Sequence, residues 1–241
     1  MPEQCFLPCI LKKGAEEVGV FLSQEKIEKF LIYLEELKRW NKKINLTALE
    51  EDKEIIVKHF LDSLTLCSVM NKIPQEVVDI GPGAGFPSLP LKIVLPQIKC
   101  TLVEARKKKV DFLHHIVEKL CLKGVVLINK RAEEFAREKE ARGRFDVAVA
   151  RAVAKLNILL EYTLPYLKIG GYLISQKGRY PEKEVEEAKR ALSILGGEVE
   201  RIKKIKLPFF DIPRSLVVIR KIKETPSGYP RRPGIPAKRP L

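Results

Sequence analysis

The segment from Val77 to Pro87 constrains the fold of this chain more than any other. It reads Val-Val-Asp-Ile-Gly-Pro-Gly-Ala-Gly-Phe-Pro, so a short apolar run with a carboxylate precedes three alternating glycines. The apolar run predicts a buried strand. The glycines predict a turn at its carboxyl end, because glycine adopts positive φ and lets a ligand approach the backbone closely. In open α/β sheets, ligands bind just outside the carboxyl ends of strands. The segment therefore predicts a nucleotide-type cofactor site.

The spacing of the glycines narrows the class of cofactor. A dinucleotide fingerprint requires G-x-G-x-x-G, but Phe86 stands where its third glycine would fall. The pattern is D-x-G-x-G-x-G and runs from Asp79 through Gly81 and Gly83 to Gly85. It resembles the first motif of the Rossmann-like S-adenosylmethionine-dependent methyltransferases. That resemblance implies a loop that holds the methionine end of S-adenosylmethionine.

Apolar runs and helical patterns alternate after Asp79, which predicts a parallel sheet covered by helices. The expected strands are Val77–Ile80, Cys100–Glu104, Val125–Asn129, Phe145–Ala150 and Tyr172–Gln176. Helices are expected at Lys107–Leu122 and Glu182–Leu195, and two further strands, near Val199–Ile205 and Leu216–Lys221, would form a closing antiparallel pair. The expected fold is therefore α/β, a mostly parallel seven-stranded sheet of the class I methyltransferase kind.

Two helical patterns precede the first strand. Ser23–Trp40 has a capping serine and one apolar stripe, and Lys53–Met70 has a second stripe. We expect residues 1–72 to form a small helical cap and residues 73–221 to form the cofactor-binding domain. Residues 222–241 are rich in proline and carry five basic residues against one acid. Such a segment favours either a solvated tail or a basic arm that orders on nucleic acid.

Composition limits the partners and the compartment. The chain has 45 basic and 31 acidic residues, a formal charge of +14, which favours a polyanionic partner. The sequence contains no run of 18 apolar residues, so we expect no transmembrane helix. The five cysteines are scattered and form no zinc pattern, so we expect a reduced, cytoplasmic setting and no metal.

Polar residues follow three of the later strands. Glu104 ends the second strand, where an acid can accept hydrogen bonds from the ribose hydroxyls of an adenosine cofactor. Ala132 and Glu133 follow the third strand, where the backbone of this fold usually reaches adenine, although Glu133 also suits an ordinary helix start. Arg151 ends the fourth strand, and a buried guanidinium needs a partner. That partner would be a bound ligand or an acid such as Asp62.

Absent motifs bear on the methyl acceptor. After the fourth strand the chain has no Asn/Asp-Pro-Pro-Tyr/Phe motif, as used for exocyclic amino groups, and no Pro-Cys nucleophile for cytosine C5. Guanine N7 has its own lone pair, so an enzyme that methylates it needs neither and works by positioning.

Several further segments resemble one family, the bacterial ribosomal RNA small subunit methyltransferase G (glucose-inhibited division protein B) family, over about Asn41 to Leu241. They are WNKKINLT (40–47), HFLDSL (59–64), FPSLPL (86–91), ARAVA (150–154), KG (177–178), RSLVVI (214–219) and YPRRPGIPAKRPL (229–241). Pro82 and Ser88 depart from the residues that are commoner in the family's loop. The resemblance implies methylation of one guanine N7 in 16S ribosomal RNA, with S-adenosylmethionine as donor.

The resemblance also implies roles for individual residues. Carried over by position, the cofactor contacts are Gly81, Phe86, Ala132, Glu133 and Arg151. Arg131, Lys177 and Arg214 match basic positions that would hold the guanine and adjacent phosphates, and Arg151, Lys177 and Arg214 form the expected catalytic set. Asn45, His59 and Asp62 match the cap's motifs and are expected either to line the same cleft or to serve structural roles. The expected partner is 16S RNA, a 30S subunit or an assembly intermediate, bound by a monomer.

Three other classes stay open. An NAD-dependent oxidoreductase is disfavoured by the glycine spacing and by the lack of a Tyr-x-x-x-Lys motif. A non-enzymatic ribosome-binding or cell-division factor would not explain the glycine loop. A methyltransferase for a small molecule or a protein would leave the charge of +14 without a purpose.

Overall fold

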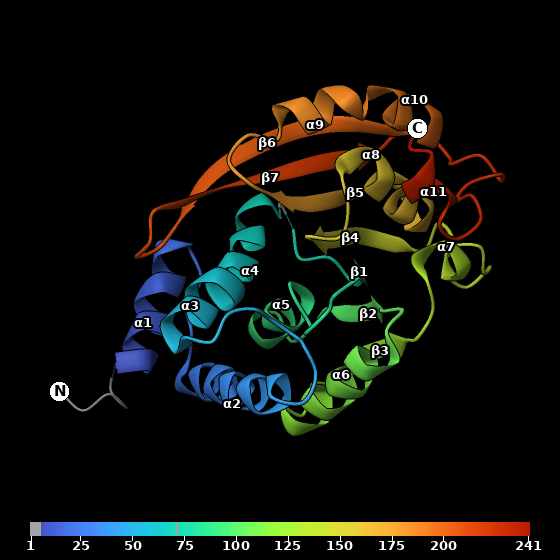
Figure 1. Ribbon diagram of the computed structural model, residues 1–241. Helices are drawn as coiled ribbons and strands as arrows, with labels where there is room; N and C mark the ends of the chain where they lie inside the picture. Colours follow the sequence, from blue (N-terminus) through green and yellow to red (C-terminus); the bar gives the residue numbers. More distant parts are fainter. Residues whose placement is uncertain (1–5, 71) are drawn as a thin grey trace.

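The computed structural model describes residues 6–70 and 72–241; Cys5, one of the five cysteines, lies outside them. Its centre is a seven-stranded sheet with the strand order β3-β2-β1-β4-β5-β7-β6 (Figure 1). The strands are β1 (Glu76–Ile80), β2 (Lys99–Val103), β3 (Val125–Ile128), β4 (Phe145–Arg151), β5 (Leu167–Lys177), β6 (Gly197–Leu207) and β7 (Ile212–Lys221). Strands β1 to β5 are parallel, and β7 runs antiparallel between β5 and β6. The sheet and its closing antiparallel pair are confirmed.

Alternating side chains along the strands build two cores, one on each face of the sheet. Val77 and Val149 belong to the first core, whereas their neighbours Val78 and Ala148 belong to the second. The first core lies under α1 (Phe6–Glu17), α2 (Gln24–Asn41), α3 (Asp52–Ile55), α4 (Asp62–Leu64), α5 (Ser88–Val94) and α6 (Lys107–Lys119). The second lies under α7 (Ala132–Phe135), α8 (Leu156–Thr163), α9 (Glu182–Glu187) and α10 (Lys189–Leu195). Figure 1 shows these two groups of helices on opposite sides of the sheet.

The cap shares its core with the sheet. Ser23 accepts a hydrogen bond from the Lys26 backbone N–H and so caps α2, as its position predicts. Phe30 and Leu37 on that helix lie in the same apolar cluster as Val77 of β1. No separate core marks off residues 6–70, so the cap is packed as part of one side of the sheet.

The second cap segment differs from the single helix expected over 53–70. Helix α3 passes into a π-helix (Ile56–Leu61), then into α4, and ends in a 3-10 helix (Thr65–Val69). A π-helix adds one residue to a turn and is frequent at functional sites. Here it carries His59 and lies directly before Asp62.

Of the two alternatives for residues 222–241, the solvated tail is wrong. The side chain of Arg231 makes hydrogen bonds to both carboxylate oxygens of the buried Glu161, on α8, at 2.8 to 3.2 Å. Arg142 donates to the carbonyls of Thr225 and Tyr229. Pro230 and Pro236 are buried, the latter in the short helix α11 (Ile235–Lys238). The tail is basic, but Arg231 and several of its backbone groups have hydrogen-bond partners within the protein.

None of the described helices is long and apolar enough to cross a membrane.

Candidate active site

The glycine loop joins β1 to α5 in the left-handed conformation that its sequence predicts. Gly81, Gly83 and Gly85 have φ values of 67°, 61° and 96°. A Cβ on Gly85 would lie 2.4 Å from the Tyr33 hydroxyl, which donates to the Ala84 carbonyl at 2.5 Å. At Gly83 a Cβ would meet only the Lys109 ammonium, at 3.6 Å. Gly85 is therefore required for packing against the cap, whereas Gly83 leaves open space beside the loop.

Asp79 lies at the root of this loop and is fully buried. Its Oδ2 accepts the Ser88 backbone N–H at 3.1 Å, and its Oδ1 has no hydrogen-bond partner among the described residues. Burial, offset only in part by hydrogen bonding from Ser88, raises the pKa of Asp79 to about 7. A buried carboxylate oxygen without a donor is costly. It suits a cationic group such as the α-ammonium of S-adenosylmethionine.

Glu104 follows β2 and binds the loop. Its Oε2 accepts the Gly83 N–H at 3.1 Å, and its Oε1 accepts the Arg106 N–H at 2.9 Å. Each carboxylate oxygen has a second lone pair, so these bonds leave acceptors for ribose hydroxyls. The residues present at this edge of the sheet therefore fit the cofactor that the glycine pattern predicts.

The segment after β3 begins α7. The Glu134 carboxylate accepts the Arg131 backbone N–H at 3.0 Å. Glu133 is buried, and its Oε1 accepts the Gly234 N–H of the tail at 3.0 Å. The Ala132 carbonyl accepts the Tyr166 hydroxyl at 2.7 Å. Both of the residues expected near adenine are thus held in place, Ala132 by Tyr166 and Glu133 by the tail, residues 222–241.

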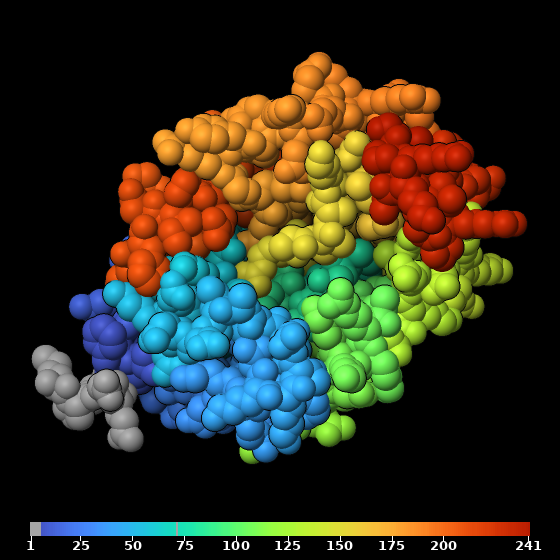
Figure 2. Space-filling model, viewed as in Figure 1, coloured from blue at the N-terminus to red at the C-terminus, as the bar shows by residue number. Residues whose placement is uncertain are grey.

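A pocket of about 730 Å³ opens beside the loop, at the carboxyl ends of β4 and β5. The cap contributes Thr47, Ala48, Leu49, Lys58, His59 and Asp62, and the sheet side contributes 151–155, 176–178, Glu184 and Arg214. A Cβ on Gly81 would lie 3.0 Å from Val153, which lines this pocket. Figure 2 shows a hollow near the centre of this face, bordered by the cyan cap segment and by the yellow segment that follows β4.

Arg151 lies between the loop and the cap. Its Nη1 donates to Asp62 Oδ2 at 3.3 Å and to the Lys58 carbonyl at 3.0 Å, and its guanidinium carbon lies 4.9 Å from the centre of the Phe86 ring. Burial raises the pKa of the Asp62 carboxyl, and the charges of Arg151 and Arg214 oppose that shift. The ion pair with Asp62 is therefore present. Arg151 and Asp62 both line the pocket, so the ion pair also fixes the position of a cation there.

His59 is neutral at ordinary pH. Burial, followed by the charge of Arg151, lowers its pKa to about 3. Its Nδ1 lies 3.1 Å from Arg151 Nη2 and its Nε2 lies 2.7 Å from Thr47 Oγ1. The same Nδ1 also lies 3.1 Å from the Lys58 carbonyl, which can only accept, so Arg151 and Lys58 favour opposite tautomers of the ring. The imidazole also stacks on Phe86, with ring centres 4.6 Å apart.

Lys177 and Arg214 enter the pocket from β5 and β7. The Lys177 ammonium donates to Glu184 Oε2 at 2.7 Å and to the Ala154 carbonyl at 3.0 Å. Arg214 Nε lies 3.6 Å from Asp62 Oδ1. Next to them, Gln176 Nε2 donates to the Asp62 carbonyl at 2.8 Å, and Gln176 Oε1 has no partner among the described residues. Two cations and one free acceptor thus gather at one side of the pocket.

The structure brings together Arg151, Lys177, Arg214, His59 and Asp62, but not every expected site residue. Asn45 is exposed and Arg131 is exposed at the start of α7, and neither lines this pocket. Sequence reasoning missed Tyr33, Gln176 and Glu184, and it missed Asn41, whose side chain binds the backbone of Leu46 and Thr47. The position of Asn41 in the WNKKINLT segment was the only available signal for it.

The fold and the glycine loop define a Rossmann-like S-adenosylmethionine-dependent methyltransferase. A solved structure of a SAM-dependent methyltransferase from Aquifex aeolicus aligns with 77% of this chain and 98% of its own, at 18% identity and a TM-score of 0.54. M. jannaschii TYW2 in complex with AdoMet aligns with 67% of this chain and 77% of its own, at 17% identity and a TM-score of 0.51. These similarities support the fold.

The sequence comparisons identify the family. Residues 26–215 match the model of the family described as rRNA small subunit methyltransferase G. A relative with the name ribosomal RNA small subunit methyltransferase G, from Acetivibrio thermocellus, is 47% identical over 96% of both chains. Another, from Desulforamulus reducens, is 48% identical over 98% of both. The chain therefore belongs to the rRNA small subunit methyltransferase G family, and the resemblance seen in its motifs is confirmed.

Proposed function

We propose that this protein is a cytoplasmic enzyme that methylates N7 of one guanine in 16S ribosomal RNA, with S-adenosylmethionine as methyl donor. The observation that carries the proposal is the pocket beside the glycine loop, where Arg151, Lys177 and Arg214 converge in a chain of this family. The +14 charge supports a nucleic-acid substrate. The acceptor is either the RNA alone or the RNA within a 30S subunit or an assembly intermediate.

The residues of the pocket act by positioning. When bound, S-adenosylmethionine supplies an electrophilic methyl group on a sulfonium centre. Guanine N7 carries a free lone pair, so no residue has to remove a proton before attack, and the neutral His59 is not needed as a base. Lys177 and Arg214 hold guanine O6 and the adjacent phosphates and leave N7 free. The residues therefore lower the barrier by fixing N7 in line with the methyl group.

Cofactor-side residues hold the donor at the sheet edge. Asp79 accepts from the α-ammonium, the backbone of Gly81 and Gly83 faces the methionine moiety, and Glu104 accepts from the ribose. Ala132 and Glu133 border adenine. This assignment rests on the orphaned Asp79 Oδ1 and on the open space beside Gly83. We propose that Asn45 and Arg131, outside the pocket, contact RNA farther from the reacting guanine.

The direct test uses tritiated S-adenosylmethionine with two acceptors, 30S subunits that lack this methyl group and deproteinised 16S RNA. Nuclease digestion and mass spectrometry then locate the label. We expect 7-methylguanine at a single position in at least one acceptor. Label on another base, or no label on either acceptor while the cofactor still binds, would contradict the proposal.

Lys177→Ala separates transfer from cofactor binding. We expect kcat/KM for RNA to fall at least about tenfold, which equals roughly 1.4 kcal/mol of transition-state stabilisation. The affinity for S-adenosylmethionine should change less than about twofold, because the hydrogen bonds of Lys177 go to Glu184 and to the Ala154 carbonyl and to no described residue of the glycine loop. Lys139→Ala, at an exposed lysine outside the pocket, is the matched control. Equal losses in transfer and in cofactor affinity would refute the role given to Lys177.

A further inference from the structure

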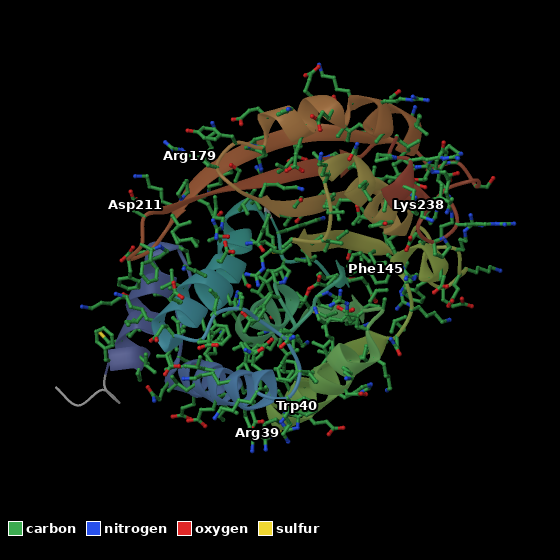
Figure 3. The ribbon with its side chains drawn as sticks, viewed as in Figure 1. Arg39, Trp40, Phe145, Arg179, Asp211 and Lys238 are labelled. Carbon is green, nitrogen blue, oxygen red and sulfur yellow. The ribbon has the colours of Figure 1, made fainter. Side chains whose placement is uncertain are left out.

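A second pocket, of about 700 Å³, lies next to the first and shares Arg214 with it. Its walls come from the segment after β5 and from the β6–β7 hairpin. The residues on which the argument depends are Arg179, Tyr180, Lys204, Lys206, Asp211 and Arg214. In Figure 3 the labelled Arg179 and Asp211 lie at the same end of the molecule, and the labelled Lys238 lies at the other. Apart from Arg214, no residue of this second pocket belongs to the proposed contacts with the cofactor or the guanine.

An exposed aromatic ring stands in this pocket beside a guanidinium. Tyr180 is 70% exposed, and the Arg179 guanidinium carbon lies 5.0 Å from the centre of its ring. Nucleic-acid bases in single strands stack on aromatic side chains and on arginine planes. A tyrosine that is kept open to solvent next to a cation therefore offers a platform for an unpaired base.

The remaining charges suit a phosphate backbone. Lys204 pairs with Glu182 at 2.7 Å, and Lys206 pairs with Asp211 at 3.0 Å. All four side chains are more than half exposed, so these pairs are weak and exchange readily for a phosphate. Arg179 and Arg214 add two further cations. A strongly anionic ligand is therefore favoured over a neutral one.

The two pockets are continuous along the chain. Lys177 and Gly178 line the first, and Arg179 and Tyr180, the next two residues, line the second. Three extended residues span at most about 10 Å, so a base on Tyr180 would be close to a guanine held by Lys177. The same RNA strand can thus occupy both.

We propose that the second pocket binds a nucleotide that flanks the methylated guanine, with its base stacked on Tyr180 and its phosphate held by Lys204 and Lys206. The ligand class is single-stranded RNA, and the inference rests on the proposed function. It adds that the substrate guanine must lie in an unpaired segment, since a base within a duplex cannot stack on a side chain.

Kinetics with 30S subunits and deproteinised 16S RNA test the platform. Tyr180→Ala should raise KM for the accepted RNA about tenfold, with kcat and the affinity for S-adenosylmethionine unchanged within about twofold. Tyr180→Phe, which keeps the ring, should behave as the wild type. Phe21→Ala, at an exposed aromatic outside both pockets, is the matched control. An unchanged KM in Tyr180→Ala, or an equal loss in Tyr180→Phe, would overturn the proposal.

A fluorescence measurement reports stacking without catalysis. In a Trp40→Phe background, which removes the single tryptophan, the indole introduced by Tyr180→Trp should be quenched by pentaadenylate, and the indole introduced by Phe21→Trp should not be. Pentaglutamate, a polyanion without bases, should leave the indole of the Tyr180→Trp variant unquenched. Quenching by both probes would mean binding by charge alone and would refute base stacking.

The two failures can be told apart. If the wild type methylates 16S RNA while Tyr180→Ala keeps its KM and the Tyr180→Trp variant is not quenched, the flanking site fails and the proposed function stands. If the wild type transfers no methyl group to either RNA, the proposed function fails, whatever the fluorescence reports.

Discussion

Gly83 and Gly143 share a left-handed backbone, with φ values of 61° and 63°, but differ in their place in the molecule. Gly83 belongs to the loop between Asp79 and α5, whereas Gly143 lies in an exposed turn, where an added Cβ would have no atom within 4 Å. Alanine substitutions at these two glycines therefore distinguish two effects. One is the strain of a side chain at positive φ, and the other is the loss of space for a ligand.

We expect Gly83→Ala and Gly143→Ala to lower the free energy of unfolding alike, by about 1 kcal/mol each, since both place a Cβ in the left-handed region. Only Gly83→Ala should weaken S-adenosylmethionine binding, by at least about tenfold, because its methyl group enters the cofactor's space. Thermal melts and titration calorimetry measure the two effects. Equal cofactor affinity in both variants would remove Gly83 from the site.

At the scale of single residues, the sequence predicts the role of a residue when its immediate neighbours reveal it. Glycine at positive φ and an acid after a strand are visible in the order of residues, and the three glycines adopt that conformation. The hydrogen-bond partners of such residues cannot be predicted from the order of residues. Tyr33 reaches Ala84 across 51 positions, and Gln176 reaches Asp62 across 114. Such contacts depend on how distant elements pack, which no local pattern encodes.

The π-helix over Ile56–Leu61 carries His59 and lies directly before Asp62, and both of these residues line the pocket. A helix was expected over 53–70 because apolar residues recur there at helical spacing, and that spacing does not distinguish an α-helix from one with an added residue per turn. The change of helix type rotates the residues that follow it. It accompanies a segment in which both His59 and Asp62 contact Arg151.

His59 and Asp79 make the free energy of unfolding depend on pH in opposite directions. His59 titrates near 6.5 when unfolded and near 3 when folded, so the unfolded state takes up the extra proton and acid destabilises the fold between those values. Asp79 titrates near 3.8 when unfolded and near 7 when folded, so the folded state holds the extra proton and its stabilisation is lost as pH rises toward 7. Each slope is about 1.4 kcal/mol per pH unit.

We therefore expect the contributions of His59 and Asp79 to the free energy of unfolding to cancel each other between pH 4 and 6.5, so that the two variants depart from the wild type in opposite directions. His59→Gln should leave the Asp79 slope, so that stability rises as pH falls, and Asp79→Asn should leave the His59 slope, so that stability drops. Urea unfolding at several pH values measures all three curves. Parallel curves would show that neither group titrates as its burial requires.

The molecule as a whole is one sheet with a core on each face, and residues 222–241 close the second side. Composition favoured either a solvated tail or a basic arm that orders on nucleic acid, because the segment is basic, rich in proline and without apolar period. The structure instead satisfies it with carboxylates of the domain, Glu133 and Glu161. Composition describes a segment alone, so it could not reveal acceptors that other elements supply.

Arg231→Ala should lower the free energy of unfolding by about 2 kcal/mol, because it leaves the carboxylate of Glu161 buried without its partner. It should also weaken S-adenosylmethionine binding, since the tail holds Glu133 through Gly234. Arg232→Ala removes the same charge from an exposed neighbour and should stay within about 0.5 kcal/mol of the wild type. If both variants behaved alike in melts and in calorimetry, the tail would act only through its charge.

The placement of β7 between β5 and β6 bears on how the chain is made. A chain is synthesised from its N-terminus, and within residues 6–70 and 72–241 the only strand that pairs with β6 is β7. Residues 197–207 must therefore wait for residues 212–221 before their strand can pair, and the tail that holds Glu133 follows later still. The contact that holds Glu133 therefore forms only after the last strand has been translated, and a chain whose synthesis has reached β7 still lacks it.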